Sequence, residues 1–216
     1  MPKGIYILSG LGADERAFGQ MDFAGAEVSC IKWVLPDHGE SITHYAGRLL
    51  PQIKSPKPIL IGLSFGGIMA IELAKQIATE HVILIASVKA HDELPFYYRW
   101  AGTVGIQRLL PVRLFKRANV ITNWFFGATS EPARALLKRI LADTDPAFLK
   151  WAINQIVCWR NTASPARLTH IHGTADRILP IRFVTPDIRI NNGGHFMTWE
   201  QSEEISRLIA GLLSGF

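Results

Sequence analysis

The alternation of short apolar runs with longer amphipathic stretches is the feature that most limits the folds open to this chain. Six runs have the length and apolar character of strands that are covered on both faces. Residues 41–54 and 65–79, which separate three of these runs, have helical patterns, and Ser41 is a candidate N-cap for the first. Such alternation predicts an α/β fold with a doubly wound, mostly parallel sheet of about six strands. The predicted strands are 5–8, 27–33, 58–63, 81–86, 167–172 and 187–191.

The strand pattern stops near Ser87 and returns near Arg167. The intervening stretch of about 80 residues is too long for a plain loop in a compact domain. It carries helix-start signals, in which Ser130 and Asp145 are each followed by an early-helix proline. We therefore expect a core domain formed by residues 1–87 and 166–216, with a helical cap, residues 88–165, inserted before the last two strands. A closing amphipathic helix is predicted from about Trp199 to Leu213.

Basic charge is concentrated in the middle of the chain. Residues 88–167 hold 12 Lys and Arg against 5 Asp and Glu, a balance of +7 in a chain whose net charge is +5. A solvated basic face is the simpler interpretation, and an acidic carrier or a membrane surface that meets the basic and apolar segment 106–117 is the alternative. The sequence has no nucleic-acid motif, no phosphate-binding glycine loop and no metal-ligand spacing, so we expect no nucleic-acid partner, no metal and no cofactor.

The sequence also bears on location and redox state. It has no run of about 18 apolar residues, and its first residues lead into a strand-like segment without the apolar region of a signal peptide. We therefore expect no integral membrane association and a cytoplasmic protein. The two cysteines, Cys30 and Cys158, lie in unrelated settings and are predicted to be free thiols.

The segment Gly62-Leu63-Ser64-Phe65-Gly66 ends a predicted strand and opens a predicted helix. A serine at such a sharp turn has a strained backbone, and its hydroxyl lies above the sheet edge. The flanking glycines remove side chains where strand and helix approach each other, and the helix directs its positive end towards charge that develops near the serine. Because the pattern stands in this strand–turn–helix context, we predict that Ser64 is a nucleophile.

A serine hydroxyl is a weak nucleophile unless a base lies beside it. The base should follow the carboxyl end of another strand, because those ends meet at one edge of a parallel sheet. His195, in Gly193-Gly194-His195-Phe196, follows the last predicted strand and has this position. The other histidines lie within strands, at turns or at the start of the inserted segment, and we expect structural or surface roles for them. They are His38, His44, His81, His91, His170 and His172.

A carboxylate should orient the base and stabilise its protonated form. Asp176 follows the fifth predicted strand at its carboxyl end and is the first choice. Asp187 begins a strand, which places it at the opposite edge of the sheet. Asp92 follows an earlier strand and remains the alternative.

The chain order Ser64, Asp176, His195 is the order described for α/β-hydrolases, and the sequence resembles that superfamily over nearly its whole length. Ser9-Gly10-Leu11-Gly12 looks like the His-Gly-x-Gly oxyanion loop of the family, with Ser9 in place of the histidine. The segment 35–41, Leu-Pro-Asp-His-Gly-Glu-Ser, is similar to its Pro-Gly-x-Gly-x-Ser stretch. The resemblance implies that the backbone N–H groups of Leu11 and Phe65 form the oxyanion hole.

The chain departs from the family pattern in one respect, because the two strands that usually precede the oxyanion loop are missing. We therefore expect a sheet with reduced N-terminal strands. Close to the proposed oxyanion site, Asp14 and Arg16 are predicted to form a local ion pair that holds the loop.

The resemblance implies a small capped serine hydrolase of the carboxylesterase type, which forms an acyl-enzyme. The inserted segment holds four of the six tryptophans, so its aromatic residues either line an apolar pocket or build a core of their own. We expect the partner to be a small-molecule ester with a small or medium apolar acyl or aryl group. Two alternatives stay open, namely a lyase or carbon–carbon bond hydrolase that uses similar residues, and a ligand-binding receptor with vestigial hydrolysis.

Overall fold

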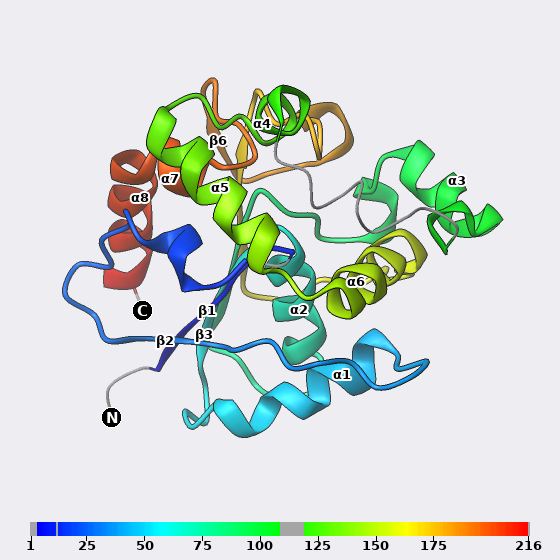
Figure 1. Cartoon of the computed structure of the whole chain (residues 1–216). Helices are drawn as coiled ribbons and strands as arrows, with labels where there is room; N and C mark the ends of the chain where they lie inside the picture. The colour runs from blue at the N-terminus through cyan, green and yellow to red at the C-terminus, as the bar shows by residue number, and fades with distance from the viewer. Residues whose placement is uncertain (1–3, 12, 109–118, 216) are drawn as a thin grey trace.

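The computed structural model describes residues 4–11, 13–108 and 119–215, and its centre is a six-stranded sheet. The strands are arranged in the order β2-β1-β3-β4-β5-β6, and every neighbouring pair is parallel (Figure 1). This confirms the predicted fold class. The strands are β1 (Ile5–Leu8), β2 (Val28–Cys30), β3 (Ile59–Leu63), β4 (His81–Ile85), β5 (Leu168–Gly173) and β6 (Ile188–Ile190).

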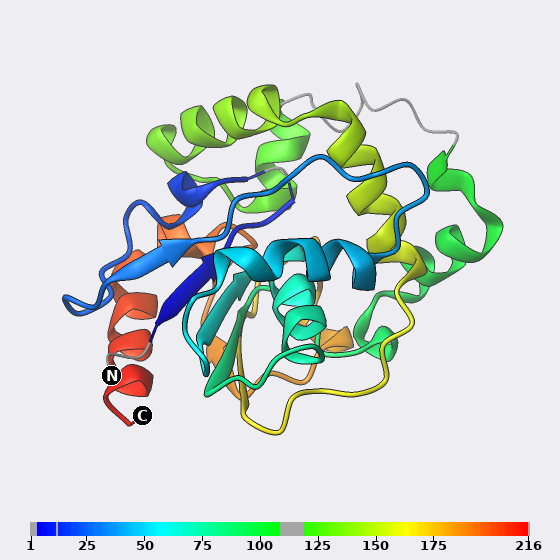
Figure 2. The same cartoon turned by 90° about the horizontal axis from the view of Figure 1, so that it is seen from below.

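Alternate residues of the central strands enter two separate apolar cores, because successive side chains of a strand point to opposite faces. Ile59 and Ile61 of β3 belong to the core that includes α8 (Ser202–Ser214), whereas Leu60 belongs to the core on the other face. That second core includes α1 (Ile42–Leu49) and α2 (Phe65–Ala74) (Figures 1 and 2). Helices on both faces explain why the strands read as continuous apolar runs.

Helical structure fills most of the described part of the chain between β4 and β5, as the sequence predicts. Ser130 Oγ accepts from Ala133 N, and Asp145 Oδ1 accepts from Ala147 N at 2.8 Å, so both predicted caps are present. Most of the basic segment 106–117 lies outside the described residues. The helices are α3 (Phe96–Val104), α4 (Val120–Phe126), α5 (Glu131–Asp143) and α6 (Pro146–Cys158).

Polar contacts join this helical stretch to the core. Trp151 Nε1 of α6 donates to the carbonyl oxygen of Glu40 at 2.8 Å, and Trp159 Nε1 donates to Glu72 Oε1 of α2 at 2.8 Å. Arg16, which is paired with Asp14 as predicted, also reaches Asp143 Oδ2 at the end of α5, with Nη2 at 2.7 Å. Polar bonds therefore tie α5 and α6 to segments of the core that cover the two faces of the sheet.

The prediction of a single closing helix is wrong. The structure has two helices, α7 (Met197–Glu200) and α8, with a break at Gln201, whose φ and ψ are −129° and 36°. Two side chains at this break bind other segments. Gln201 Nε2 donates to the carbonyl oxygen of Asn191, and Glu200 Oε1 accepts from the backbone N–H groups of Thr129 and Ser130. Amphipathic periodicity reports the buried face of the helices but carries no signal for these contacts.

Three smaller predictions concern Ser41, the cysteines and the membrane. Ser41 caps α1, because its Oγ accepts from His44 N at 3.2 Å. Cys30 and Cys158 are free thiols, as expected. Among the helices of the described ranges, none is long and apolar enough to cross a bilayer.

Candidate active site

Ser64 stands between the end of β3 and the start of α2, in a backbone conformation that favours glycine. Its φ and ψ are 53° and −119°, which costs on the order of 1–3 kcal/mol for a residue with a side chain. The strain is held by hydrogen bonds from both sides. Ser64 N donates to the carbonyl oxygen of Ile85 at 2.9 Å, and Ser87 Oγ donates to the carbonyl oxygen of Ser64 at 2.7 Å. These two hydrogen bonds, to the end of β4 and from the segment that follows it, hold the turn in its strained conformation.

Close backbone packing explains the glycines on either side of Ser64. A Cβ atom on Gly66 would overlap the carbonyl oxygen of Leu8, and one on Gly62 would overlap the backbone of Gly66. The first strand, the third strand and α2 thus meet without intervening side chains. This is also where the strand order reverses direction, since β2 lies on one side of β1 and β3 lies on the other. In open parallel sheets, ligands bind outside the carboxyl ends of the strands at such a point.

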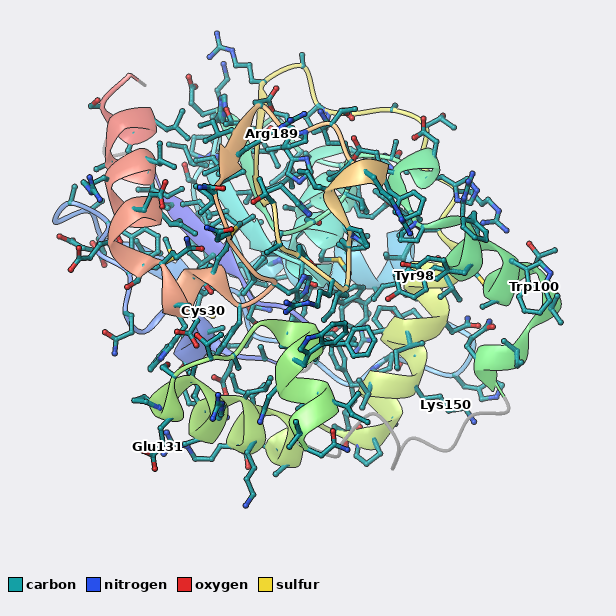
Figure 3. All side chains as sticks on the ribbon, turned by 90° about the horizontal axis from the view of Figure 1, so that it is seen from above. Cys30, Tyr98, Trp100, Glu131, Lys150 and Arg189 are labelled. Atoms are coloured by element: carbon teal, nitrogen blue, oxygen red, sulfur yellow. The ribbon has the colours of Figure 1, made fainter. Side chains whose placement is uncertain are left out.

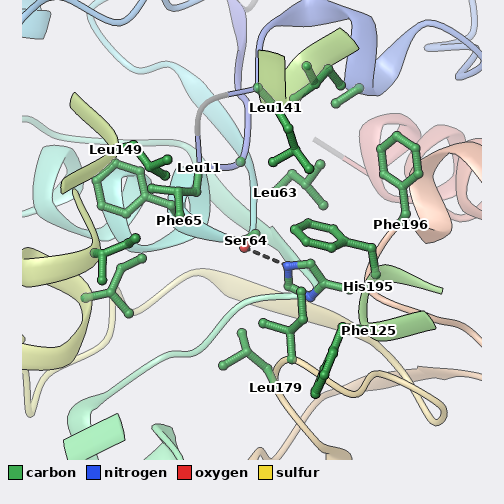
Figure 4. A pocket seen from close by; sticks show the side chains of 18 of the residues that line it. Leu11, Leu63, Ser64, Phe65, Phe125, Leu141, Leu149, Leu179, His195 and Phe196 are labelled. Atoms are coloured by element: carbon green, nitrogen blue, oxygen red, sulfur yellow. Dashed lines mark hydrogen bonds between the residues drawn. The ribbon is translucent and has the colours of Figure 1, made fainter. Parts of the chain in front are cut away.

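The structure brings Ser64, His195 and Asp176 into one hydrogen-bonded row. His195 Nε2 lies 2.8 Å from Ser64 Oγ, and His195 Nδ1 lies 2.7 Å from Asp176 Oδ2 (Figure 4). Because an ionised carboxylate can only accept, the Nδ1–H group donates to Asp176, and Nε2 is left to accept from the serine hydroxyl. The row therefore places the basic nitrogen of the imidazole against the hydroxyl.

Asp176 is buried and ionised. Burial raises its pKa, but its interactions with His195 and His172 and the hydrogen bond from the backbone of Leu179 together outweigh burial, so its pKa lies below the ordinary value. Its second oxygen, Oδ1, accepts from the backbone N–H groups of Ile178 and Leu179 at 2.8 and 2.9 Å. The alternative acid, Asp92, is exposed in a short 3-10 turn, His91–Glu93. Asp187 lies elsewhere, with Oδ2 accepting from His170 N.

The loop after β1 lies directly against Ser64. A Cβ atom on Gly10 would stand 3.5 Å from Ser64 Cβ, and Leu11 lines the same cavity as Ser64 and Phe65. Trp33 Nε1 donates to Ser9 Oγ, and Ser9 Oγ in turn donates to the carbonyl oxygen of Ala13, so the serine closes the loop on itself. Gly12 lies outside the described residues. Phe65 is the first residue of α2, and the N–H groups of a first helical turn lack intrahelical acceptors.

Two buried histidines stand behind the aspartate. His172 Nε2 donates to the carbonyl oxygen of Leu179 at 2.8 Å and lies 3.6 Å from Asp176 Oδ2. This fixes the tautomer of His172, whose Nδ1 then accepts from His170 Nε2 at 3.1 Å. The sequence predicts a structural or surface role for both histidines, and the structure places both in the buried part of β5. The structure adds that His172 holds the backbone of the residue that donates to Asp176.

These histidines should make the protein sensitive to acid. Burial, with smaller effects from His172 and Lys89, lowers the pKa of His170 from 6.5 to about 3, and burial also lowers that of His172. Below pH 6.5 the unfolded chain binds protons that the folded protein excludes, so the free energy of unfolding falls as the pH falls towards 3. We expect His170→Gln to reduce the difference in unfolding free energy between pH 7 and pH 5 by on the order of 1–2 kcal/mol.

Urea unfolding at the two pH values measures this difference, and His38→Gln is the matched control because His38 is exposed. An equal reduction in both variants would show that the buried pair is not the source of the acid sensitivity.

A cavity of about 480 Å³ opens at Ser64 and is almost entirely apolar. In Figure 4, Leu141 and Leu149 lie on different sides of Ser64, and Phe125 and Leu179 lie near His195. Phe126 also covers the His195 ring edge-on, with ring centroids 5.7 Å apart. The helices of the inserted stretch therefore supply much of the lining. Sequence reasoning missed these residues. The face of α6 that helical periodicity marks, with Phe148 and Trp151, packs against the aromatic side chains of Trp33, Tyr45 and Phe65 instead.

No group of three His, Cys, Asp or Glu side chains in the described ranges is arranged to hold a metal ion. Chemistry at this site can be carried by the hydroxyl, the imidazole and the carboxylate, which together form a nucleophile, a base and an orienting group.

Comparisons with known proteins bear on the family and the fold of the chain. The sequence model of the family described as "Alpha/beta hydrolase family" matches residues 5–208. No curated protein gives a significant match. Among solved structures, Est816, described as an N-acyl homoserine lactone degrading enzyme, is 18% identical, with a TM-score of 0.70 over 98% of this chain and 93% of the other.

Two further structures are similar in fold. An esterase from Thermogutta terrifontis is 16% identical, with a TM-score of 0.72 over 99% of this chain and 90% of the other. An enol-lactonase from Burkholderia xenovorans LB400 is 16% identical, with a TM-score of 0.65 over 98% of this chain and 92% of the other. At these identities the likeness concerns the fold.

Proposed function

This chain belongs to the alpha/beta hydrolase family, and from that premise we propose that it is a serine hydrolase that cleaves carboxylic esters with small or medium apolar acyl or aryl groups. The observation that carries the proposal is the hydrogen-bonded row of Ser64, His195 and Asp176 at the base of an apolar cavity. A buried carboxylate, an imidazole and a strained serine in this order are the arrangement that activates a hydroxyl for attack on a carbonyl carbon.

In the first half of the proposed reaction, Ser64 Oγ attacks the ester carbonyl while its proton passes to His195 Nε2. The carbonyl oxygen becomes an oxyanion, for which the backbone N–H groups of Leu11 and Phe65 are the proposed donors. His195 then gives its proton to the departing alkoxide, and the alcohol leaves behind an acyl group on Ser64. Removal of one such oxyanion donor costs on the order of 10²–10³ in rate, so the loop after β1 is a sensitive part of the site.

In the second half, water attacks the acyl-enzyme and gives its proton to His195 Nε2. The tetrahedral intermediate collapses, Ser64 recovers a proton from His195, and the carboxylic acid is released. Asp176 carries a negative charge beside the imidazolium that forms in both halves. Because this charge is fixed by Ile178 N and Leu179 N before the reaction begins, no reorganisation is required in the transition state.

The cavity lining supports an apolar substrate. Ile140 and Leu141 come from α5, and Ile153 and Ile156 come from α6. A charged or strongly polar group would lose its hydration here without gaining partners. We propose that residues 88–165 act as a cap over the core formed by residues 1–87 and 166–216, since helices of that segment contribute lining on different sides of Ser64.

A series of p-nitrophenyl esters tests this proposal. We expect kcat/KM to rise from acetate towards octanoate by up to about fourfold for each methylene that becomes buried. The double variant Leu141→Trp/Leu149→Trp fills both sides of the cavity and should abolish the rise, while hydrolysis of the acetate changes little. Leu35→Trp is the control, because Leu35 is 61% exposed and does not line the cavity.

Absence of hydrolysis for every ester of the series would contradict the esterase proposal and favour the lyase or receptor alternatives. Hydrolysis with no dependence on acyl length would agree with esterase chemistry but contradict the proposal that the cavity binds the acyl group.

A further inference from the structure

Large apolar side chains are exposed on two helices of the inserted stretch. On α3, Phe96, Trp100 and Val104 follow one another at intervals of four residues and are 62%, 60% and 59% exposed, so they form one stripe. On α4, Val120 is 84% exposed and Trp124 is 55% exposed. Neither role that the sequence predicts for the aromatic residues of this segment, the lining of a pocket or a core of its own, accounts for the exposure of Phe96, Trp100 and Trp124. Exposed apolar surface of this extent marks an interaction site.

The loop after β5 joins the two helices into one surface. The guanidinium of Arg177 lies 4.4 Å from the ring of Trp124 and donates to its carbonyl oxygen. Arg182 lies 4.9 Å from the ring of Phe183, and that ring is 6.3 Å from the ring of Phe96. Figure 1 shows α4, this loop and α3 along one edge of the molecule, and Figure 3 shows them from above. We call the surface the aromatic–arginine face, formed by Phe96, Trp100, Trp124, Arg177, Arg182 and Phe183.

The charge of this face has one sign. The sequence has no Asp or Glu between Leu94 and Ser130 or between Arg177 and Pro186, whereas Arg99, Arg177 and Arg182 belong to the described part of these segments. A second copy of the chain that used the same face would bring like charges together, which opposes a symmetric dimer. A partner with a negatively charged surface and an apolar interior complements both the arginines and the exposed apolar side chains of the face.

The face also adjoins the cavity that contains Ser64. Ile121 and Phe125 of α4 line this cavity and are 65% and 42% exposed, and Tyr98 of α3 lines it as well. Apolar side chains of α4 therefore belong both to the wall of the cavity and to the exposed surface beside the face.

We propose that the aromatic–arginine face docks on the surface of a bilayer that contains anionic phospholipid. Tryptophan, phenylalanine and valine enter the boundary between headgroups and acyl chains, and the arginines contact lipid phosphates. The docking depends only on this face. The accompanying inference, that ester substrates reach Ser64 from the bilayer, rests on the proposed function.

Co-sedimentation with vesicles tests the docking. The vesicles are made of ether-linked lipids, so that hydrolysis at Ser64 cannot change them, and contain either phosphatidylcholine alone or equal parts of phosphatidylcholine and phosphatidylglycerol. We expect at least about tenfold tighter partitioning onto the anionic vesicles at low salt, since each of the arginines contributes roughly fivefold. We also expect this preference to weaken at high salt and tryptophan emission to shift to the blue on binding.

Variants locate the contact. Trp100→Ser/Trp124→Ser should weaken partitioning by about tenfold or more, and Arg182→Gln should weaken it about fivefold on anionic vesicles only. Leu35→Ser is the matched control, because Leu35 is as exposed as Trp100 and lies outside the face. Hydrolysis of a soluble p-nitrophenyl ester by the same variants should stay at the level of the unchanged protein, which separates failure of docking from failure of the esterase proposal.

Four results would overturn the proposal. The first is equal partitioning onto neutral and anionic vesicles, and the second is an effect of Leu35→Ser as large as that of the double variant. The third is tighter binding to soluble polyglutamate than to anionic vesicles, which would assign the face to an acidic macromolecule. The fourth is a dimer in sedimentation velocity that Trp100→Ser abolishes, which would assign the face to a second copy.

Discussion

Replacement of Ser64 by alanine is expected to reduce kcat for ester hydrolysis by about 10⁵–10⁶-fold and to leave the protein folded. The substitution removes the only oxygen that His195 Nε2 contacts in the row, so no nucleophile remains to form an acyl-enzyme. The backbone bonds that hold the turn, from Ser64 N to Ile85 and from Ser87 to the Ser64 carbonyl, do not involve the lost hydroxyl. Turnover of p-nitrophenyl butyrate and covalent labelling by a fluorophosphonate measure the effect.

Ser41→Ala is the control for this prediction. It removes the cap of α1, which should cost about 1 kcal/mol of unfolding free energy, and it should leave labelling and turnover unchanged. The two variants therefore separate loss of chemistry from loss of stability. Fluorophosphonate labelling that persists in Ser64→Ala would refute the assignment of the nucleophile.

Replacement of Asp176 by asparagine is expected to reduce kcat about 10⁴-fold, with a small change in KM. A neutral amide gives no charge to stabilise the imidazolium, and it allows the other tautomer of His195, in which Nε2 carries a proton and cannot accept one from Ser64. The backbone donors of Ile178 and Leu179 can still bind the amide oxygen, so the turn should be preserved. The ratio of kcat to KM and the extent of labelling are the measured quantities.

Asp92→Asn is the matched substitution, because the sequence left Asp92 open as the acid. Since Asp92 is exposed in the turn after β4, we expect its replacement to change kcat by less than about twofold. A larger loss in Asp92→Asn than in Asp176→Asn would reverse the assignment of the acid.

The sequence was sufficient to predict the sheet and to select Ser64 and His195, two residues that the structure brings within hydrogen-bond distance of each other. Buried parallel strands must be continuously apolar, and the turn at Ser64 admits only glycine at Gly62 and Gly66. Both features can therefore be recognised in the local sequence. The local sequence does not distinguish Asp176 from Asp92, because both follow strands and only the tertiary arrangement shows which of them contacts His195.

The break at Gln201 and the lining of the cavity could not be predicted from local sequence for a related reason. Both depend on side chains that bond or pack across long separations, such as Glu200 with Thr129 and Phe126 with His195. The exposure of Trp100 and Trp124 could not be predicted either, since an aromatic residue in a helix has the same local sequence pattern whether it faces a core or solvent.

The bonds that tie the inserted helices to the sheet limit how this protein can be engineered or can diverge. Trp151 and Trp159 of the inserted stretch bind Glu40 and Glu72 of the core, and Arg16, a few residues after the loop that follows β1, binds Asp143. A segment transplanted from a relative without matching partners would lose these bonds, and the buried Glu72 would keep only its contacts with Thr43 and Lys75. The helices that line the cavity are therefore the same helices that are bonded to the core. A change of substrate specificity should be easier to obtain by single substitutions of lining residues than by exchange of the whole segment.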